Sequence, residues 1–133
     1  MARSLIQTVN QSSQPVAIGG IISLGSTQRR YGCNLRLSGN GIEVTGEGYF
    51  SIDADVSVTP TAAGPVTVAL YRNGQQIPGA IAYTTGTDGA PVAVSINATI
   101  RRGCCCEEAD NITAVLEEGA GNVQNIAVRV VKE

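Results

Sequence analysis

Histidine and tryptophan are absent from this chain, and its only lysine is Lys132, next to the last residue. Histidine is the commonest general base and a frequent metal ligand, so its absence removes the usual partner of a serine or cysteine nucleophile. A serine–lysine pair is disfavoured as well, because the one lysine stands at the end of the chain. The sequence therefore predicts a protein that is not an enzyme and holds no cofactor or metal.

Long apolar runs and an excess of positive charge are missing too. No stretch of about 18 apolar residues occurs, which argues against a membrane-spanning helix. Residues 1–17 lack the apolar core of a secretory signal. The formal net charge is −2, so no broad basic surface for nucleic acid is expected. We expect neither a membrane nor a nucleic acid as a partner, and synthesis without a signal peptide.

Apolar and polar residues alternate along much of the chain, which is the period-two pattern of half-buried strands. In residues 48–59 the alternation places Phe50, Ile52 and Val56 on one face. No window of comparable length has the period of a helix. The Asn73–Gly74 pair predicts a hairpin turn that requires positive φ at both residues. Strands are expected at 5–9, 16–24, 35–37, 42–45, 48–59, 65–72, 75–83, 91–100, 111–117 and 123–132.

The spacing of these strands and turns predicts the fold class. It is all-β, a two-sheet antiparallel sandwich of about ten short strands, and the turn spacing suits both sandwiches and jelly rolls; the resemblance described below implies the jelly-roll form. The length predicts a single domain over residues 1–133, with residues 1–15 forming either an arm or the first strand.

Four cysteines are present, namely Cys33 and the consecutive Cys104, Cys105 and Cys106. Adjacent residues of an extended chain point to alternate sides. Zinc sites normally leave two to four residues between ligands, so a metal site is disfavoured. A redox centre would need a Cys-x-x-Cys motif near a helix start. Two interpretations stay open: thiols that pack as small hydrophobic groups, or Cys104, Cys105 and Cys106 as inter-chain thiols where several chains meet.

Asp53 and Asp55 fall on one face of the strand predicted at 48–59. A pair of carboxylates can serve glycoside hydrolysis, but the sequence offers no further acid, base or oxyanion-binding group. Solvation or ion pairing is the favoured interpretation of these side chains.

Residues 41–80, GIEVTGEGYFSIDADVSVTPTAAGPVTVALYRNGQQIPGA, resemble the C1q/TNF-like jelly-roll superfamily. The matching features are a glycine at Gly48, the aromatic pair Tyr49–Phe50 that opens a long strand, and the V-x-V-x-L-x-x-N-G hairpin that ends at Gly74. The closing NVQNIAVRVV resembles the last strand, and the similarity covers about residues 16–132. The chain looks most like small bacterial and bacteriophage members, such as spore-surface filament tips and virion decoration or head-fibre proteins.

This resemblance implies a homotrimer on the outside of a particle, in the first place a phage virion. There it would act as a capsid decoration or head-fibre protein and could aid adsorption. The alternatives are a spore- or cell-surface module, or a carbohydrate-binding adhesin domain. The implied partners are further copies of the chain, other virion or surface proteins and, for the adhesin, a host-surface glycan. The chain would be synthesised in the bacterial cytoplasm.

The resemblance also places the first, last, 48–59 and 91–100 strands in one sheet. One face of that sheet closes the core and the other turns toward the threefold axis. The last strand then lies beside strand 48–59, so Arg129 reaches Asp53 or Asp55 in its own chain or a neighbour's. The implied interface residues are Tyr49, Ser51, Asp53, Asp55, Ser95, Asn97, Thr99 and Arg129.

Two further expectations follow from the same strand order. Arg72, beside the hairpin turn, is expected to be exposed and tolerant of charge reversal. Loops 25–34 and 101–110 are expected at opposite ends of the sandwich, which would put Cys33 too far from the cysteine triplet for a disulfide within one chain.

Overall fold

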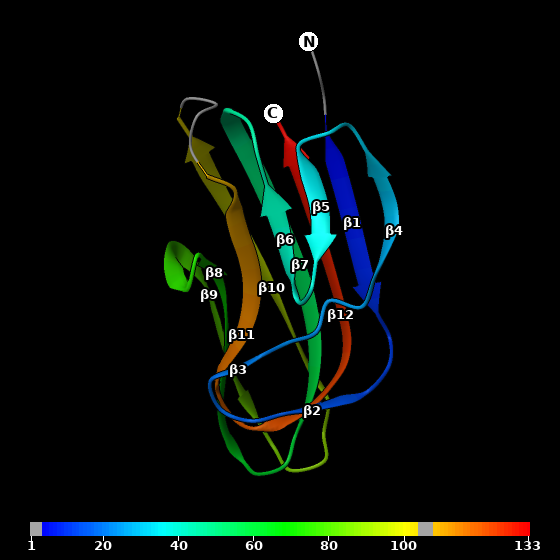
Figure 1. Ribbon diagram of the computed structural model, residues 1–133. Coiled ribbons are helices and arrows are strands. Elements are labelled where there is room, and N and C mark those ends of the chain that lie inside the picture. Colours follow the sequence, from blue (N-terminus) through cyan, green and yellow to red (C-terminus); the bar gives the residue numbers. More distant parts are fainter. Residues whose placement is uncertain (1–3, 104–107) are drawn as a thin grey trace.

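The computed structural model describes residues 4–103 and 108–133, which form twelve strands (Figure 1). No helix occurs in this part of the chain, and so none that could span a membrane. The strands are β1 Leu5–Asn10, β2 Gln14–Val16, β3 Gly20–Ile21, β4 Ser26–Tyr31, β5 Leu35–Ser38, β6 Gly41–Val44, β7 Gly48–Pro60, β8 Gly64–Arg72, β9 Gln75–Gly86, β10 Val92–Arg102, β11 Asp110–Glu118 and β12 Gly121–Lys132.

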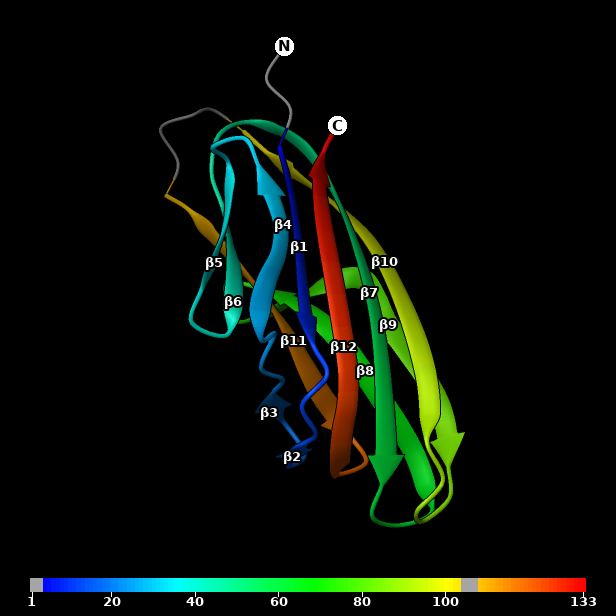
Figure 2. The ribbon, with the colours of Figure 1, turned by 90° about the vertical axis from the view of Figure 1, so that its right-hand side faces the viewer.

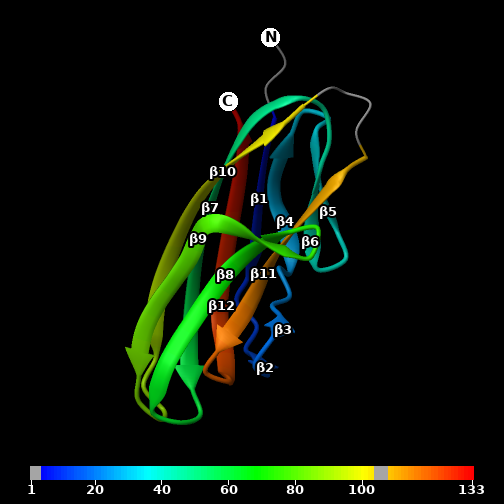
Figure 3. The ribbon, with the colours of Figure 1, turned by 90° about the vertical axis from the view of Figure 1, so that its left-hand side faces the viewer.

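The strands form two antiparallel sheets. The first sheet has the order β10-β7-β12-β1-β4, with β2 also paired to β12 (Figure 2). The second has the order β5-β6-β11-β8-β9, with β3 paired to β11 (Figure 3). The prediction of an all-β, two-sheet antiparallel jelly roll is confirmed. The first, last, 48–59 and 91–100 strands do share one sheet, as β1, β12, β7 and β10.

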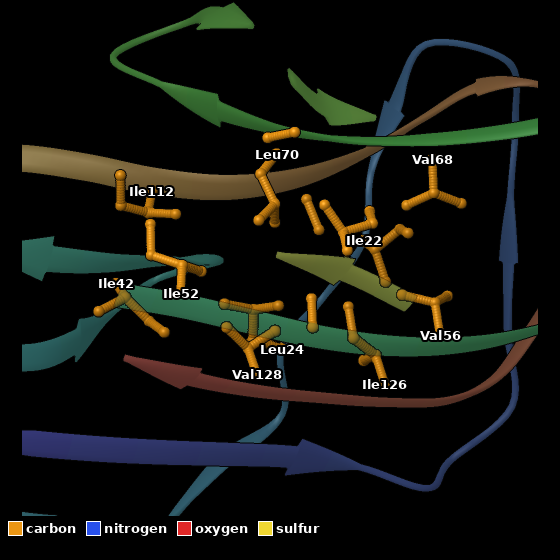
Figure 4. Packing of buried hydrophobic residues seen from close by; sticks show 14 of the residues in the cluster. Ile22, Leu24, Ile42, Ile52, Val56, Val68, Leu70, Ile112, Ile126 and Val128 are labelled. Carbon is orange, nitrogen blue, oxygen red and sulfur yellow. The ribbon is translucent and has the colours of Figure 1, made fainter. Parts of the chain in front are cut away.

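The core lies between the two sheets and is built by the alternation seen in the sequence. Figure 4 shows Ile52, Val56, Ile126 and Val128 of the first sheet lying against side chains of the second, such as Leu70. The inward residues of β7 and β12 are all buried, including Phe50 at 0% exposure. Each buried valine, isoleucine or phenylalanine among them contributes roughly 1.5–3 kcal/mol by leaving water. The predicted core faces of these two strands are therefore confirmed.

A β-bulge changes the pattern at the start of β12. The register against β7 shifts between Val123 and Asn125, so Val123 and Ile126 are both fully buried although three residues apart. Gln124, which strict alternation would place on the core face with Ile126, is exposed instead. An inserted residue of this kind resets the two-residue period along one strand.

The region before residue 35 differs most from expectation. The single strand predicted at 16–24 is two short strands, β2 and β3, separated by a turn in which Gly19 has φ of 81°. The segment predicted as loop 25–34 contains β4, an edge strand paired only with β1. All six residues of β4 are exposed. A strand with no buried side gives no hydrophobic alternation, so the sequence pattern could not reveal it.

Because β4 runs along the sheet, the β4–β5 connection lies at the opposite end of the sandwich from the start of the segment predicted as loop 25–34. Leu35, just after Cys33, pairs with Val44, and Val44 pairs with Asp110 on its other side. The β4–β5 connection, the end of β10 and the start of β11 therefore lie at the same end of the sandwich, the upper end in Figure 1. The prediction of opposite ends was wrong. The prediction of no disulfide within the chain stays open, because Cys104, Cys105 and Cys106 lie outside the described residues.

The hairpin between β8 and β9 turns at Asn73 and Gly74, with φ of 53° and 81°, as predicted. Its Asn73 also ties the turn to β11. The Asn73 side-chain amide donates to Asp110 Oδ1 at 2.7 Å, and its Oδ1 accepts from the Asn111 amide at 2.8 Å. The turn is therefore held by long-range hydrogen bonds as well as by its own backbone conformation.

A buried ion-pair network centres on Asp110. Arg102 Nη1 and Arg72 Nη2 each lie 2.6 Å from Asp110 Oδ2. The Arg102 side chain is 0% exposed and also donates to the carbonyl oxygens of Gly46, at 2.7 Å, and Glu108, at 3.0 Å. Arg72 was expected to be exposed and tolerant of charge reversal; it is instead partly buried and paired with Asp110, which argues against that expectation. The sequence shows that Arg72 precedes a hairpin turn, but it does not indicate Asp110 as its partner.

We expect Asp110→Ala to destabilise the fold by about 3–5 kcal/mol, because it leaves the buried Arg102 charge without its carboxylate. The matched control is Glu43→Ala, which removes an exposed pair with Arg36 at 3.1 Å and should cost at most about 1 kcal/mol. Urea unfolding of both variants measures the difference. Equal losses in the free energy of unfolding would show that the network stabilises the fold no more than an exposed ion pair does.

Ionisation of the Asp110 carboxylate should make the stability of the fold depend on pH. Burial alone would raise the pKa of Asp110. Hydrogen bonds from Arg72, Asn73 and Arg102 lower it by more than burial raises it, so the pKa lies below its ordinary value of 3.8. A lowered folded-state pKa gives stability that is present above the unfolded-state pKa and is lost as pH falls through the folded-state value. Thermal melts from pH 7 to pH 2 should show a steeper loss for the natural protein than for Asp110→Asn. Parallel curves would contradict this.

Candidate interaction face

The outer face of the first sheet gathers every residue of the predicted interface. Because alternate residues of a strand point to opposite sides, burying Phe50, Ile52 and Val56 turns their neighbours on β7 outward. Cross-strand pairing then aligns Asp55 with Ser95 and Asp53 with Asn97. The face carries Tyr49, Ser51, Asp53 and Asp55 on β7, Ser95, Asn97 and Thr99 on β10, and Arg129 on β12. That these residues form an interface remains a prediction.

The hydroxyl and amide groups of the face already bind its carboxylates. Ser95 Oγ donates to Asp55 Oδ1 at 2.6 Å, and Ser51 Oγ donates to Glu133 Oε2 at 2.6 Å. With its nitrogen turned toward Asp53, the Asn97 amide donates to Asp53 Oδ1 at 2.6 Å. These short bonds to charged acceptors hold the acidic side chains in place on the sheet surface.

Arg129 lies directly opposite Asp53 on the neighbouring strand. The strands that carry Arg129 and Asp53 are neighbours, as predicted. A contact of Arg129 with Asp53 or Asp55, in its own chain or a neighbour's, stays a prediction. The Arg129 guanidinium makes no ion pair with any residue in the described part of the chain. Arg129 is exposed and keeps its hydrogen-bonding capacity for a group from outside the chain.

One polar row crosses the whole sheet at the level of Arg129. Backbone pairing aligns Asn97 with Asp53, Asp53 with Arg129, Arg129 with Gln7, and Gln7 with Arg29. Sequence reasoning missed the last two members of the row. Gln7 could have been found, because it alternates with the buried Ile6 and Thr8 of the predicted first strand. Arg29 could not, because β4 itself was not recognised.

The face is hollowed beside this row. A depression of about 430 Å³ is lined by Gln7, Asp53, Asp55, Ser95, Asn97, Ala127, Val128 and Arg129. A second depression of about 380 Å³ adjoins it on the β10 side and shares Asp53 and Asn97. Small side chains such as Ser95 and Ala127 leave these hollows open, so a neighbouring surface could approach the backbone closely.

The two aspartates of the face are held by neutral hydrogen-bond donors. Asp55 accepts a hydrogen bond from the Ser95 hydroxyl, and Asp53 accepts one from the Asn97 amide. Within residues 4–103 and 108–133, no cluster of three or more acidic or cysteine side chains could hold a metal ion. The candidate inter-chain thiols Cys104, Cys105 and Cys106 lie outside these ranges.

The fold is that of TNF- and C1q-like jelly rolls. The chain is similar to murine APRIL, with a TM-score of 0.75 at 14% identity, covering 98% of this chain and 99% of that one. It is similar to the globular domain of zebrafish complement 1qA protein, with a TM-score of 0.70 at 8% identity, covering 96% and 94%. It is also similar to the PRD1 vertex protein P5, with a TM-score of 0.62 at 13% identity, covering 99% and 98%.

At these identities the likeness establishes the fold alone. No protein-family model matches the sequence, and no curated protein matches it either. The resemblance seen in residues 41–80 is therefore supported at the level of the superfamily fold.

Proposed function

We propose that this chain is a non-enzymatic structural protein that assembles as a homotrimer and decorates the outside of a phage virion. The observation that carries the proposal is the end-to-end likeness to PRD1 P5, a phage vertex protein. The exposed polar face of the first sheet supplies a surface for self-association. A chain of this length, with one phenylalanine and no tryptophan, also has a modest core to which association would add buried area.

The trimer is tested by its mass. Light scattering coupled to size exclusion should give about three times the 13.7 kDa of the chain across micromolar concentrations. A monomer mass throughout this range would refute the trimer.

The role of the face is tested by steric block. Asn97→Trp places a large side chain at an exposed position in the middle of the face and should reduce the trimer to monomer. Ser38→Trp is the matched control, at an exposed position of β5 in the other sheet, and should leave the mass unchanged. Thermal melts of both variants confirm folding. If both variants remain trimeric, the interface does not lie on this face.

The location is tested by composition. Mass spectrometry of purified virions from a phage that encodes the chain should detect it in stoichiometric amounts, and limited proteolysis of intact particles should remove it. Detection on spores or cell envelopes, and not on virions, would favour the alternative surface module of the same fold.

A further inference from the structure

The charges on the outer face of the first sheet are separated into two halves. The half formed by β7 and β10 carries Asp53 and Asp55 at its centre, and the half formed by β12, β1 and β4 carries Arg129 and Arg29. All four of these side chains are exposed. Two further charges lie near one end of this face, away from the two aspartates: Arg101, which is aligned with Tyr49, and Glu133, whose carboxylate accepts a hydrogen bond from Ser51.

Neither arginine is neutralised within the chain. In the described residues, Arg29 and Arg129 form no ion pair and no side-chain hydrogen bond. The aspartates accept hydrogen bonds only from the uncharged Ser95 and Asn97. The basic and acidic halves therefore face outward with their charges uncompensated, although Arg129 and Asp53 are aligned on adjacent strands.

A surface with one acidic and one basic half is complementary to a second copy of itself. In a ring, each copy presents one part of its surface to one neighbour and a different part to the other. Such a contact can match the basic half of one copy to the acidic half of the next at every interface. The hollow beside Asp53 and Asp55 has room for a guanidinium, which binds carboxylates through parallel hydrogen bonds.

We propose that association is head-to-tail and electrostatic, with the Arg29–Arg129 half of one copy docked on the Asp53–Asp55 half of the next. This inference rests on the proposed self-association and adds its partner surfaces and its physical basis. Opposed charges at such a contact speed the encounter of two copies and disfavour wrong orientations, and juxtaposed like charges weaken binding strongly.

Two double variants test the proposal. Asp53→Lys with Asp55→Lys makes both halves basic, and Arg29→Glu with Arg129→Glu makes both halves acidic. Each alone should raise the dissociation constant at least tenfold, and an equimolar mixture should form oligomers that contain both chains by native mass spectrometry. The control pair is Asp88→Lys and Arg36→Glu, both at exposed positions outside the face, which should associate like the natural protein.

The outcomes separate this inference from the proposed function. A natural protein that is monomeric refutes the proposed function as well. A natural oligomer whose charge-reversed variants also associate refutes only the electrostatic contact. Failure of the mixture to form oligomers that contain both chains would also refute the electrostatic contact, because the oppositely charged halves would then not bind each other.

A second measurement needs no substitution. Raising the salt concentration from 0.05 M to 0.5 M should weaken association of the natural protein at least tenfold, because salt screens exposed charges. A dissociation constant that is unaffected or lowered by salt would overturn the electrostatic mechanism.

Discussion

The structure depends first on β7, which pairs along nearly its whole length with β10 on one side and β12 on the other. Its alternation separates two surfaces. Phe50 and Ile52 pack into the core, and Asp53 and Asp55 point outward from the same strand. Because the period of a strand is two residues, a register slip of one residue would exchange these surfaces. Burial of the apolar side therefore also fixes which polar groups are displayed, and in what order.

The buried network at one end of the sandwich depends on a different kind of constraint. Arg102 lies at the end of β10, Asp110 begins β11, and Arg72 ends β8, so a single carboxylate joins three strands from both sheets. Buried charges are tolerated only when they are paired and hydrogen-bonded. The network therefore specifies how this end of the fold closes, and Arg102 also binds the carbonyl oxygen of Glu108, the first described residue after the cysteine segment.

The sequence alone was enough to predict the elements whose two sides differ in polarity. Strands β7, β10 and β12, and the outward residues on them, follow from alternation and were placed correctly. Edge strand β4 was not predictable in this way, because none of its residues is buried. The network was missed for another reason. Arg72 and Asp110 are separated by 38 residues, and nothing in local pattern shows which distant carboxylate an arginine will meet. The bulge in β12 was missed as well, although the three-residue spacing of the apolar Val123 and Ile126 interrupts the alternation.

The unrecognised edge strand has a consequence for solubility. An edge strand exposes unpaired backbone groups, to which a further strand from another molecule can add without limit. Here β4 carries two adjacent arginines, and Arg30 Nε donates across the open side of the sandwich to the carbonyl oxygen of Leu35, on the edge strand of the other sheet. Positive charge and this cross-sheet tie therefore both disfavour the addition of a strand from another molecule along β4.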